Sequence, residues 1–330
     1  MNRRNAISTL GGAAMAARGG FAQQNGAPEA PAPQDQRLTP DVISARLRAR
    51  VRPLVCVYSG CLAKIPFPEL PEIVREMGYD GIDLTVMQGG HVDPSKYMVE
   101  LDRAFQTFQD AAIEMPMVTT SFTSASQPYA YAILYVSGQL GARFCRLGHW
   151  PPSSLAGDAR AGDATGQNAA MRTIMMRNDL TQLATTSVRC NIMSLLANHA
   201  GSYPGRSIPE AEALLAGVGR AALGYCFDPA QAVIESRSAS GWEDQLQAAL
   251  PRLGAVSLAD ATLADVDSSP SLCALGEGVI DWKKFFAGLA AARFRGPISL
   301  HLDYEVKNPI SAMKKDLAFV RARMDEAWPL

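Results

Sequence analysis

The chain has 330 residues, of which 48% are hydrophobic and 19% are charged, and its formal net charge is −1. This composition is globular and supplies enough apolar material for one large barrel-type domain or two ordinary ones. The near-neutral charge and the lack of a basic run argue against nucleic acid as the main partner, and no apolar run is long enough for a membrane span.

The N-terminus resembles a bacterial twin-arginine export signal over residues 1–22. Arg3 and Arg4 precede a mildly apolar segment at 6–17 that is rich in Ala and Gly. A disordered N-terminus is the alternative interpretation. Residues 23–50, which are rich in Pro, Gln and Ala at their start, are predicted to be a linker and lead-in. We therefore expect the mature protein to be exported, to the periplasm.

From residue 51 onward, short apolar segments alternate with helical patterns. The predicted order is strand 54–58, helix 67–77, strand 81–86, helix 95–112, strand 115–120, helix 129–140, strand 144–147, helix 169–185, strand 192–196, helix 209–217, strand 223–227, helix 242–253, strand 255–258, helix 282–292, strand 298–304 and helix 311–324. Gly78 and Gly141 are predicted to end the helices that precede them.

Eight strands, each followed by a helix, predict a single α/β domain, a (β/α)₈ TIM barrel, over residues 51–325. A doubly wound open sheet is the alternative. It is disfavoured because no GxGxxG motif follows a strand and no Walker loop occurs.

The last predicted strand, 298–304, has two different faces. Its apolar residues alternate with Ser299, His301 and Asp303, which is the period of a strand. We expect the apolar residues to face helices and the three polar ones to face the barrel interior, where buried polar groups need partners.

The four histidines all follow or end predicted strands: His91, His149, His199 and His301. In a TIM barrel the chemistry lies where strands end and βα loops begin, so we expect all four at one end of the barrel. Any one of them alone is more often an ordinary loop or core histidine. Their shared placement favours a site.

Carboxylates occur at similar places: Asp83 lies within the second strand, Asp228 ends the sixth, Asp260 follows the seventh and Asp303 lies in the eighth. Imidazoles and carboxylates that converge from several strands suit a divalent metal, and also proton transfer next to a carbonyl. A helix cap is the alternative for Asp228, where we favour the site, and for Asp260, where the two interpretations are equal.

Two further residues are candidate ligand contacts. Glu277 lies in the sequence GEGVIDW at 276–282, whose glycines allow close approach of the backbone to a ligand, although a turn before a helix capped by Asp281 fits equally. Arg146 precedes His149 and could meet an anionic or polyhydroxyl ligand, or be paired at the barrel rim.

The six cysteines are scattered and form no CxxC pair. Cys56, Cys145 and Cys226 fall inside predicted strands, where a small buried thiol is expected. The sequence leaves open whether a disulfide forms, because the predicted compartment is oxidising.

Several short motifs occur in a consistent order and spacing: GYDGIDL at 78–84, GGH at 89–91, ANHAG at 197–201, CFDPA at 226–230, LGEGVIDW at 275–282 and GPISL at 296–300. Together they resemble the xylose isomerase-like TIM barrels, the sugar phosphate isomerases/epimerases, over residues 55–324. The export signal fits an exported bacterial subgroup. This resemblance implies Mn²⁺ or Mg²⁺ at the barrel mouth, held by Glu, Asp, His and Glu that end strands five to eight, with the two glutamates moving protons beside a carbonyl.

The chain departs from that pattern at three of the four implied ligand positions. These positions hold Ala197, Asp228, Ser257 and His301, so only the Asp is retained. The resemblance therefore implies a degenerate metal site with Asp228 and His301 as its remaining ligands, and we expect weak or absent binding of Mn²⁺. The standard two-glutamate proton shuttle cannot operate here.

The sequence supports an isomerase- or epimerase-like enzyme acting on a small-molecule carbohydrate, with His199, Asp228 and His301 as catalytic groups. The remaining candidate contacts are expected to bind substrate: His91, Arg146, His149, Asn198, Asp260, Glu277 and Asp303. A non-catalytic periplasmic carbohydrate-binding barrel is the alternative, as is an exported lyase or hydrolase acting on oxidised sugars. The oligomeric state is open.

Overall fold

Eight short apolar segments form a closed parallel barrel in the computed structural model, which describes residues 51–151, 166–263 and 269–329. The strands are β1 Val55–Tyr58, β2 Gly81–Val86, β3 Glu114–Thr120, β4 Phe144–Arg146, β5 Met193–Ala197, β6 Leu223–Phe227, β7 Leu253–Leu258 and β10 Ile298–Leu300. Their order around the barrel is β1-β10-β7-β6-β5-β4-β3-β2, and β1 pairs with both β2 and β10. The predicted (β/α)₈ barrel is confirmed.

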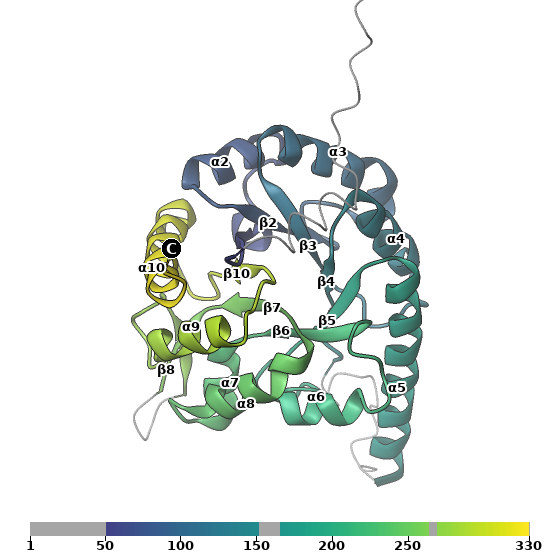
Figure 1. Cartoon of the computed structure of the whole chain (residues 1–330). Helices are drawn as coiled ribbons and strands as arrows, with labels where there is room; N and C mark the ends of the chain where they lie inside the picture. The colour runs from purple at the N-terminus through teal and green to yellow at the C-terminus, as the bar shows by residue number, and fades with distance from the viewer. Residues whose placement is uncertain (1–50, 152–165, 264–268, 330) are drawn as a thin grey trace, which may run out of the picture. The chain divides into compact units, whose positions relative to one another are not determined.

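The helices surround the strands (Figure 1). They are α2 Leu70–Met77, α3 Tyr97–Asp110, α4 Ala130–Leu140, α5 Gly166–Arg189, α6 Ile208–Leu214, α7 Pro229–Ser236, α8 Gly241–Ala249, α9 Trp282–Ala291 and α10 Pro309–Ala327. Short 3₁₀ turns add η1 Ser59–Leu62, η2 Phe67–Glu69, η3 Pro94–Lys96 and η5 Leu250–Arg252. The predicted export signal and linker lie outside the described residues. Within the described ranges, no helix is both long and apolar enough to cross a membrane.

The sequences of the strands are mostly apolar because both faces of the barrel sheet are buried. The main core lies between the barrel and its helices and includes the fully buried rings of Phe227, Phe285 and Phe286. A second, smaller cluster is separate from it and consists of Met117, Leu195, Cys226 and Ala255, contributed by four different strands. The barrel interior is therefore filled with side chains.

Several helix ends follow from single residues. Gly78 and Gly141 terminate α2 and α4 with φ of 89° and 108°, a left-handed conformation in which a Cβ would be strained. Both predicted helix ends are confirmed. At the other end, Asp228 and Asp281 cap α7 and α9 by accepting the backbone N–H of the residue three positions later.

The structure corrects the predicted elements in two loops. The segment after β6 contains two helices, α7 and α8, where only one was predicted at 242–253. The segment after β7 contains an antiparallel hairpin of β8 (Asp260–Thr262) and β9 (Ser271–Cys273), which was not predicted. These strands have three residues each, too few for a periodic pattern to reveal.

The eighth barrel strand is shorter than predicted, ending at Leu300 rather than at 304. Leu300 lies opposite Leu258, the last residue of β7, and the last described ladder bond on that side joins the His301 N–H to the Leu258 carbonyl. The next backbone N–H, of Leu302, points to the Cys61 sulfur at 3.1 Å. The inward placement of Ser299 and His301 is nevertheless confirmed: Ser299 bonds Asp83 inside the barrel and His301 lines the cavity described below.

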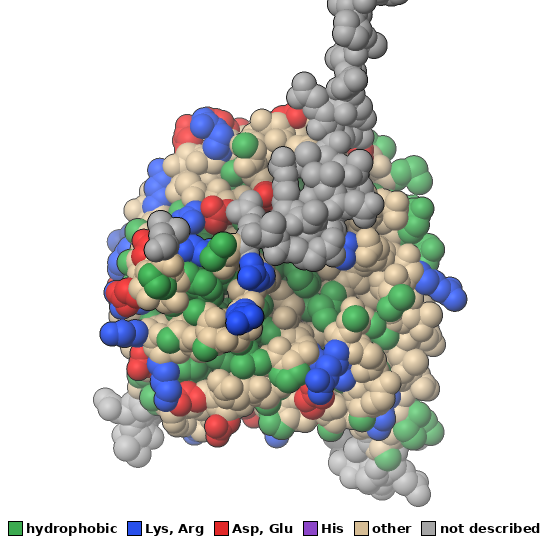
Figure 2. Space-filling model, viewed as in Figure 1, with side chains coloured by type: hydrophobic (Ala, Val, Ile, Leu, Met, Phe, Trp, Pro, Cys, Tyr) green, Lys and Arg blue, Asp and Glu red, His purple; other side chains and the backbone are tan. Residues whose placement is uncertain are grey.

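The outer faces of α4 and α5 carry exposed apolar side chains, and Figure 2 shows hydrophobic groups along that side of the molecule. Tyr131 and Tyr135, one turn apart on α4, stack with ring centroids 6.2 Å apart. Met171, Ile174 and Met175 are more than half exposed on α5. The buried faces of these helices pack on the barrel, so their exposed apolar residues contribute little to the core.

Asp260 is a structural carboxylate. Its side chain is fully buried and accepts hydrogen bonds from the backbone N–H groups of Gly276 and Gly278, at 3.0 and 3.2 Å, and from the Trp282 indole at 2.7 Å. A Cβ at Gly278 would collide with this carboxylate. Gly278 therefore lets the backbone approach Asp260, whereas a Cβ at Gly276 would meet the Phe319 ring.

We predict that Asp260→Ala destabilises the fold by roughly 3 kcal/mol or more, because it leaves several buried donors without an acceptor. Asp281→Ala, which removes only an exposed helix cap, should cost about 1 kcal/mol. Chemical denaturation of both variants measures the difference. Equal losses would contradict the role assigned to Asp260.

Candidate functional site

A cavity of about 360 Å³ lies at the barrel mouth, where the strands end. Its lining residues are Tyr58, Arg146, His149, Ala197, Asn198, His199, Asp228, Gln231, Ser257, Leu272, His301 and Asp303. Tyr58, Arg146 and Ala197 are the last residues of β1, β4 and β5. The carboxyl ends of the strands are where TIM barrels place their sites, and the volume lies in the range of small-molecule pockets.

The structure brings most of the candidate residues to this cavity. Those that line it are Arg146, His149, Asn198, His199, Asp228, His301 and Asp303. Their convergence agrees with the expectation from strand ends, and the roles assigned to them stay predictions.

Three candidates lie elsewhere. The ring of His91 forms hydrogen bonds with Thr85 Oγ1 and the Ile65 carbonyl, at 3.4 and 3.3 Å. It therefore connects its own loop to the loop that contains Ile65. Asp260 is enclosed by its own hydrogen bonds, as described above. Glu277 is exposed and forms an ion pair with Lys315 at 2.6 Å. His91 follows β2, at the same end of the barrel as the other three histidines, but it is not among the residues that line the cavity.

Sequence reasoning missed three lining residues. Tyr58 could have been found, because it ends a predicted strand and the strand-end rule applies to it equally. Gln231 lies in the first turn of α7 and Leu272 in β9, two elements that were not predicted.

His301 is buried, with 3% of its surface exposed, and stacks on the Tyr58 ring with centroids 4.2 Å apart and an interplanar angle of 8°. Burial lowers the pKa of His301 well below its ordinary value, and the positive charge of Arg146 lowers it further. The imidazole is therefore neutral at physiological pH.

Hydrogen bonding assigns the tautomer of His301. Ser299 Oγ donates to Asp83 at 2.9 Å, so toward His301 Nε2, at 3.3 Å, it acts as the acceptor. Nε2 then carries the proton and Nδ1 keeps the lone pair. Nδ1 lies 3.7 Å from Asp303 Oδ2, which also lines the cavity. The lone pair of His301 is then on the nitrogen nearer Asp303.

Asp228 is held on three sides. Asn198 brackets its backbone, donating to the Asp228 carbonyl at 2.8 Å and accepting its N–H at 2.9 Å, and Asp228 Oδ1 accepts the Gln231 N–H at 3.0 Å. Burial raises the pKa of Asp228 to about 7, opposed in part by the bond from Gln231 and reinforced by the charge of Asp303. The carboxyl can therefore give or take a proton near neutral pH.

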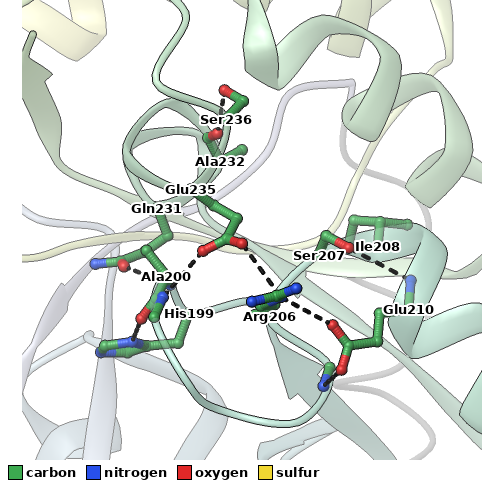
Figure 3. A network of polar contacts seen from close by, with 12 residues as sticks. His199, Ala200, Arg206, Ser207, Ile208, Glu210, Gln231, Ala232, Glu235 and Ser236 are labelled. Atoms are coloured by element: carbon green, nitrogen blue, oxygen red, sulfur yellow. Dashed lines mark hydrogen bonds and ion pairs between the residues drawn. The ribbon is translucent and has the colours of Figure 1, made fainter.

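The loop that carries His199 is tied to α7 and α6 (Figure 3). Ala200 N–H donates to Gln231 Oε1 at 3.0 Å, and Arg206 lies 3.2 Å from both Glu235 and Glu210. His199 Nδ1 lies 2.9 Å from the Ala200 carbonyl, which can only accept, so Nδ1 carries a proton. In the neutral ring the lone pair is then on Nε2.

His149, His199 and Tyr203 form an aromatic cluster on one side of the cavity. Their ring centroids are 4.9 Å apart for the two histidines and 4.5 Å apart for His199 and Tyr203. Burial lowers the pKa of His149 to about 3, helped by Arg146 and His199. His149 therefore serves as a neutral hydrogen-bonding group.

Arg146 is the cation of the cavity. Its Cζ lies 5.9 Å from the centre of the Tyr58 ring, and its buried Nε has no hydrogen-bond partner. Among the described residues, no carboxylate lies within ion-pair distance of it, although its charge lowers the pKa values of Asp228 and Asp303. The guanidinium is thus an incompletely paired charge in a largely buried place.

The donor set does not fit the divalent metal that the sequence resemblance implies. Ala197 has no donor atom, and the Ser257 hydroxyl lies 3.0 Å from the Cys226 thiol. Asp228 and His301 remain, but they share the cavity with the Arg146 guanidinium, whose charge repels a cation. No group of three or more His, Cys, Asp or Glu suited to a metal occurs within 51–151, 166–263 and 269–329.

Comparison with known proteins gives a family and several structures. The family model of xylose isomerase-like TIM barrels matches residues 71–323. No curated protein matches the chain. Among solved structures, an L-ribulose 3-epimerase aligns with a TM-score of 0.63 at 14% identity, covering 83% of this chain and 95% of its own.

Two further structures align over similar lengths. A xylose isomerase-like TIM barrel protein from Mycobacterium smegmatis, in complex with magnesium, has a TM-score of 0.65 at 12% identity and covers 83% of this chain and 97% of its own. A D-allulose 3-epimerase from Methylomonas sp., in complex with D-allulose, has a TM-score of 0.60 at 17% identity, with coverages of 82% and 97%. At these identities the likeness establishes the fold.

We predict that Mn²⁺, Mg²⁺ and Zn²⁺ bind weakly or not at all. Changes to residues around the ligands typically lower metal affinity roughly 10- to 100-fold, and loss of the ligands themselves should lower it further. Titration calorimetry of each ion measures this, and chelation should leave the melting temperature unchanged. Tight stoichiometric binding that His301→Ala abolishes would show the expectation to be wrong.

We also predict a pH-dependent stability term from Asp228. Between its ordinary pKa of 3.8 and about 7, the folded chain holds a proton that the unfolded chain has released. The stabilisation is therefore complete below about pH 4 and is lost as the pH rises to about 7. Asp228→Asn keeps the helix cap and removes this titration.

Chemical denaturation of both proteins at pH 5 and pH 8 measures the term. From pH 5 to pH 8, the wild type should lose up to about 3 kcal/mol of unfolding free energy relative to the variant. Other buried acids titrate in both proteins and cancel in the comparison. A pH-independent difference would contradict the raised pKa.

Proposed function

Because the chain belongs to the xylose isomerase-like TIM barrel family, we propose that it is a sugar isomerase or epimerase. In this proposal it moves a proton at the carbon next to the carbonyl of a carbohydrate or a related hydroxy-carbonyl compound. Two of the structural neighbours are named as sugar epimerases, which supports a sugar as the ligand class.

The observation that carries the proposal is the combination of proton-transfer groups in one cavity. Asp228 has its pKa raised to about 7, while His301 is neutral with a lone pair on Nδ1. Asp228 can therefore exchange a proton near neutral pH, and His301 offers a free lone pair in the same partly enclosed site.

The order of the strands in the barrel suits inversion of a carbon centre, or transfer of a proton between neighbouring carbons. His301 follows β10 and His199 follows β5, and these strands are three positions apart among the eight of the closed barrel. The two imidazoles therefore reach a bound ligand from nearly opposite sides. One takes the proton from carbon, and the other, once protonated, can return a proton from the other side.

The negative charge that develops on the carbonyl oxygen needs a donor when the proton leaves carbon. Protonated Asp228 can supply an O–H from strand β6, between the two histidines in barrel order. Because burial raises its pKa to about 7, this proton is present on part of the molecules near neutral pH. No step in this scheme passes through a metal.

A non-catalytic carbohydrate-binding barrel is the second candidate. It is favoured by Ala197 and Ser257, which stand where the family resemblance implies a glutamate and a histidine. A binding protein needs the cavity and its hydrogen-bonding groups but no proton transfer, so a chemical readout separates the two functions.

We predict that the protein exchanges substrate hydrogen with solvent. Aldoses, ketoses and their acid counterparts are incubated in D₂O with the metal-free protein, and deuterium at the carbon next to the carbonyl is followed by NMR. Asp228→Asn and His301→Gln should each lower the exchange by about 10²- to 10⁴-fold, the usual contribution of a general acid or base.

Lys96→Gln, at the end of η3 and away from the cavity, is the matched control and should keep the wild-type rate. Exchange that survives both cavity substitutions would refute the assigned roles. Binding of sugars with no exchange by the wild type would favour the non-catalytic barrel.

A further inference from the structure

The charge balance of the cavity differs from that of a site for a neutral sugar. Hydroxyl groups of a sugar need hydrogen-bond donors and acceptors but no net charge. Arg146 nevertheless places a full positive charge at the mouth, where the end of β4 holds its side chain against the Tyr58 ring. Burying a charge without a partner is costly, so such a group indicates a ligand that completes it.

The hydrogen bonds of Arg146 are incomplete in the same place. Its Nε is buried without a partner, and within the described ranges none of the ion pairs involves its guanidinium. By contrast, buried Arg252 bonds Glu212 at 3.1 Å and the Val218 carbonyl at 2.8 Å. Within the described residues, the chain therefore satisfies one buried arginine with its own groups, whereas Arg146, which lines the cavity, keeps a buried Nε without a partner.

We propose that Arg146 binds a carboxylate of the substrate, so that the ligand is an acidic sugar such as a uronic or sugar-derived keto acid. This inference rests on the proposed function and names the substrate class of the same site. The planar fork of a guanidinium presents two parallel N–H groups that match the two oxygens of a carboxylate.

A carboxylate fits better than a phosphate. The side chains of Asp228 and Asp303 line the same cavity, and one guanidinium faces them. A singly charged carboxylate is matched by that single cation. A phosphate dianion would meet the same two carboxyl groups with twice the charge and no second cation among the described lining residues.

The neighbours of Arg146 can serve the rest of such a ligand. His149 is a neutral hydrogen-bonding group, and Tyr58 and Gln231 place a hydroxyl and an amide on the cavity wall. Among the side-chain polar atoms of these three residues, Gln231 Oε1 accepts the Ala200 N–H, and the described part of the chain supplies no other hydrogen bond to them. The uncharged part of an acidic sugar would therefore find polar partners, and the reacting carbon would lie among His199, Asp228 and His301.

The test compares ligands that differ only at carbon 6. Binding of D-glucuronate, D-glucose and D-glucose 6-phosphate to the metal-free protein is measured by titration calorimetry. We expect D-glucuronate to bind at least about 10-fold more tightly than D-glucose, and D-glucose 6-phosphate to bind no more tightly than D-glucuronate. Equal binding of glucuronate and glucose, no binding of glucuronate, or tightest binding of the phosphate would overturn the proposal.

Substitutions assign the preference to Arg146. Arg146→Gln should lower D-glucuronate affinity about 10- to 100-fold, to the level of D-glucose, and Arg146→Lys should retain part of it. Arg75→Gln, an exposed arginine on α2 that pairs with Glu72, is the control and should change nothing. Thermal unfolding checks that each variant is folded. If Arg146→Gln fails to fold, Arg146→Lys decides: full retention of the preference would overturn the assignment.

The two proposals fail in different ways. Glucuronate binding that depends on Arg146, without hydrogen exchange on any sugar, would keep the carboxylate site and reject the isomerase or epimerase. Exchange on neutral sugars without a preference for glucuronate would keep the enzyme and reject the carboxylate site.

Discussion

Parallel pairing of β1 with β10 joins residues 55–57 to residues 298–300 and closes the barrel. This pairing places Tyr58 beside His301, so that the two rings stack 4.2 Å apart. It also brings Ser299 next to Asp83 of β2, which accepts its hydroxyl. The orientation of the imidazole at the mouth therefore depends on contacts between the first two strands and the last one, more than 200 residues apart in sequence.

Charge distribution distinguishes this barrel mouth from a metal centre. In a metal site a divalent cation offsets converging carboxylates. Here the positive charge belongs to a side chain, Arg146. Burial raises the pKa values of Asp228 and Asp303, and Arg146 opposes that rise; burial lowers the pKa values of His149 and His301, and Arg146 adds to that fall. The family fold is retained, and the electrostatics of its mouth are different.

The predictions that failed share a physical cause. His91 and Asp260 became candidates because they follow strands, and Glu277 because it lies between glycines. Their polar atoms are bonded to loop backbone or to a surface lysine. Whether a polar residue after a strand faces the cavity or fastens its own loop depends on the path of that loop. The hairpin of β8 and β9 shows this, because Asp260 at its start bonds the backbone of its own loop, whereas Leu272 in β9 lines the cavity.

Periodicity along the chain determined the barrel, the approximate position of its eight strands, and the helix ends at Gly78 and Gly141. These features follow from local rules: alternation of strand faces and the freedom of glycine at positive φ. Strand ends also predicted most of the cavity lining, since parallel strands bring their carboxyl ends together.

Tertiary structure decided which of those residues meet and how they are charged. The neutrality of His301, the raised pKa of Asp228 and the unpaired Nε of Arg146 arise from burial and from groups on other strands. Such properties depend on distances between segments far apart in the chain. A sequence pattern records the order of residues but not those distances, because they are set only when the barrel closes.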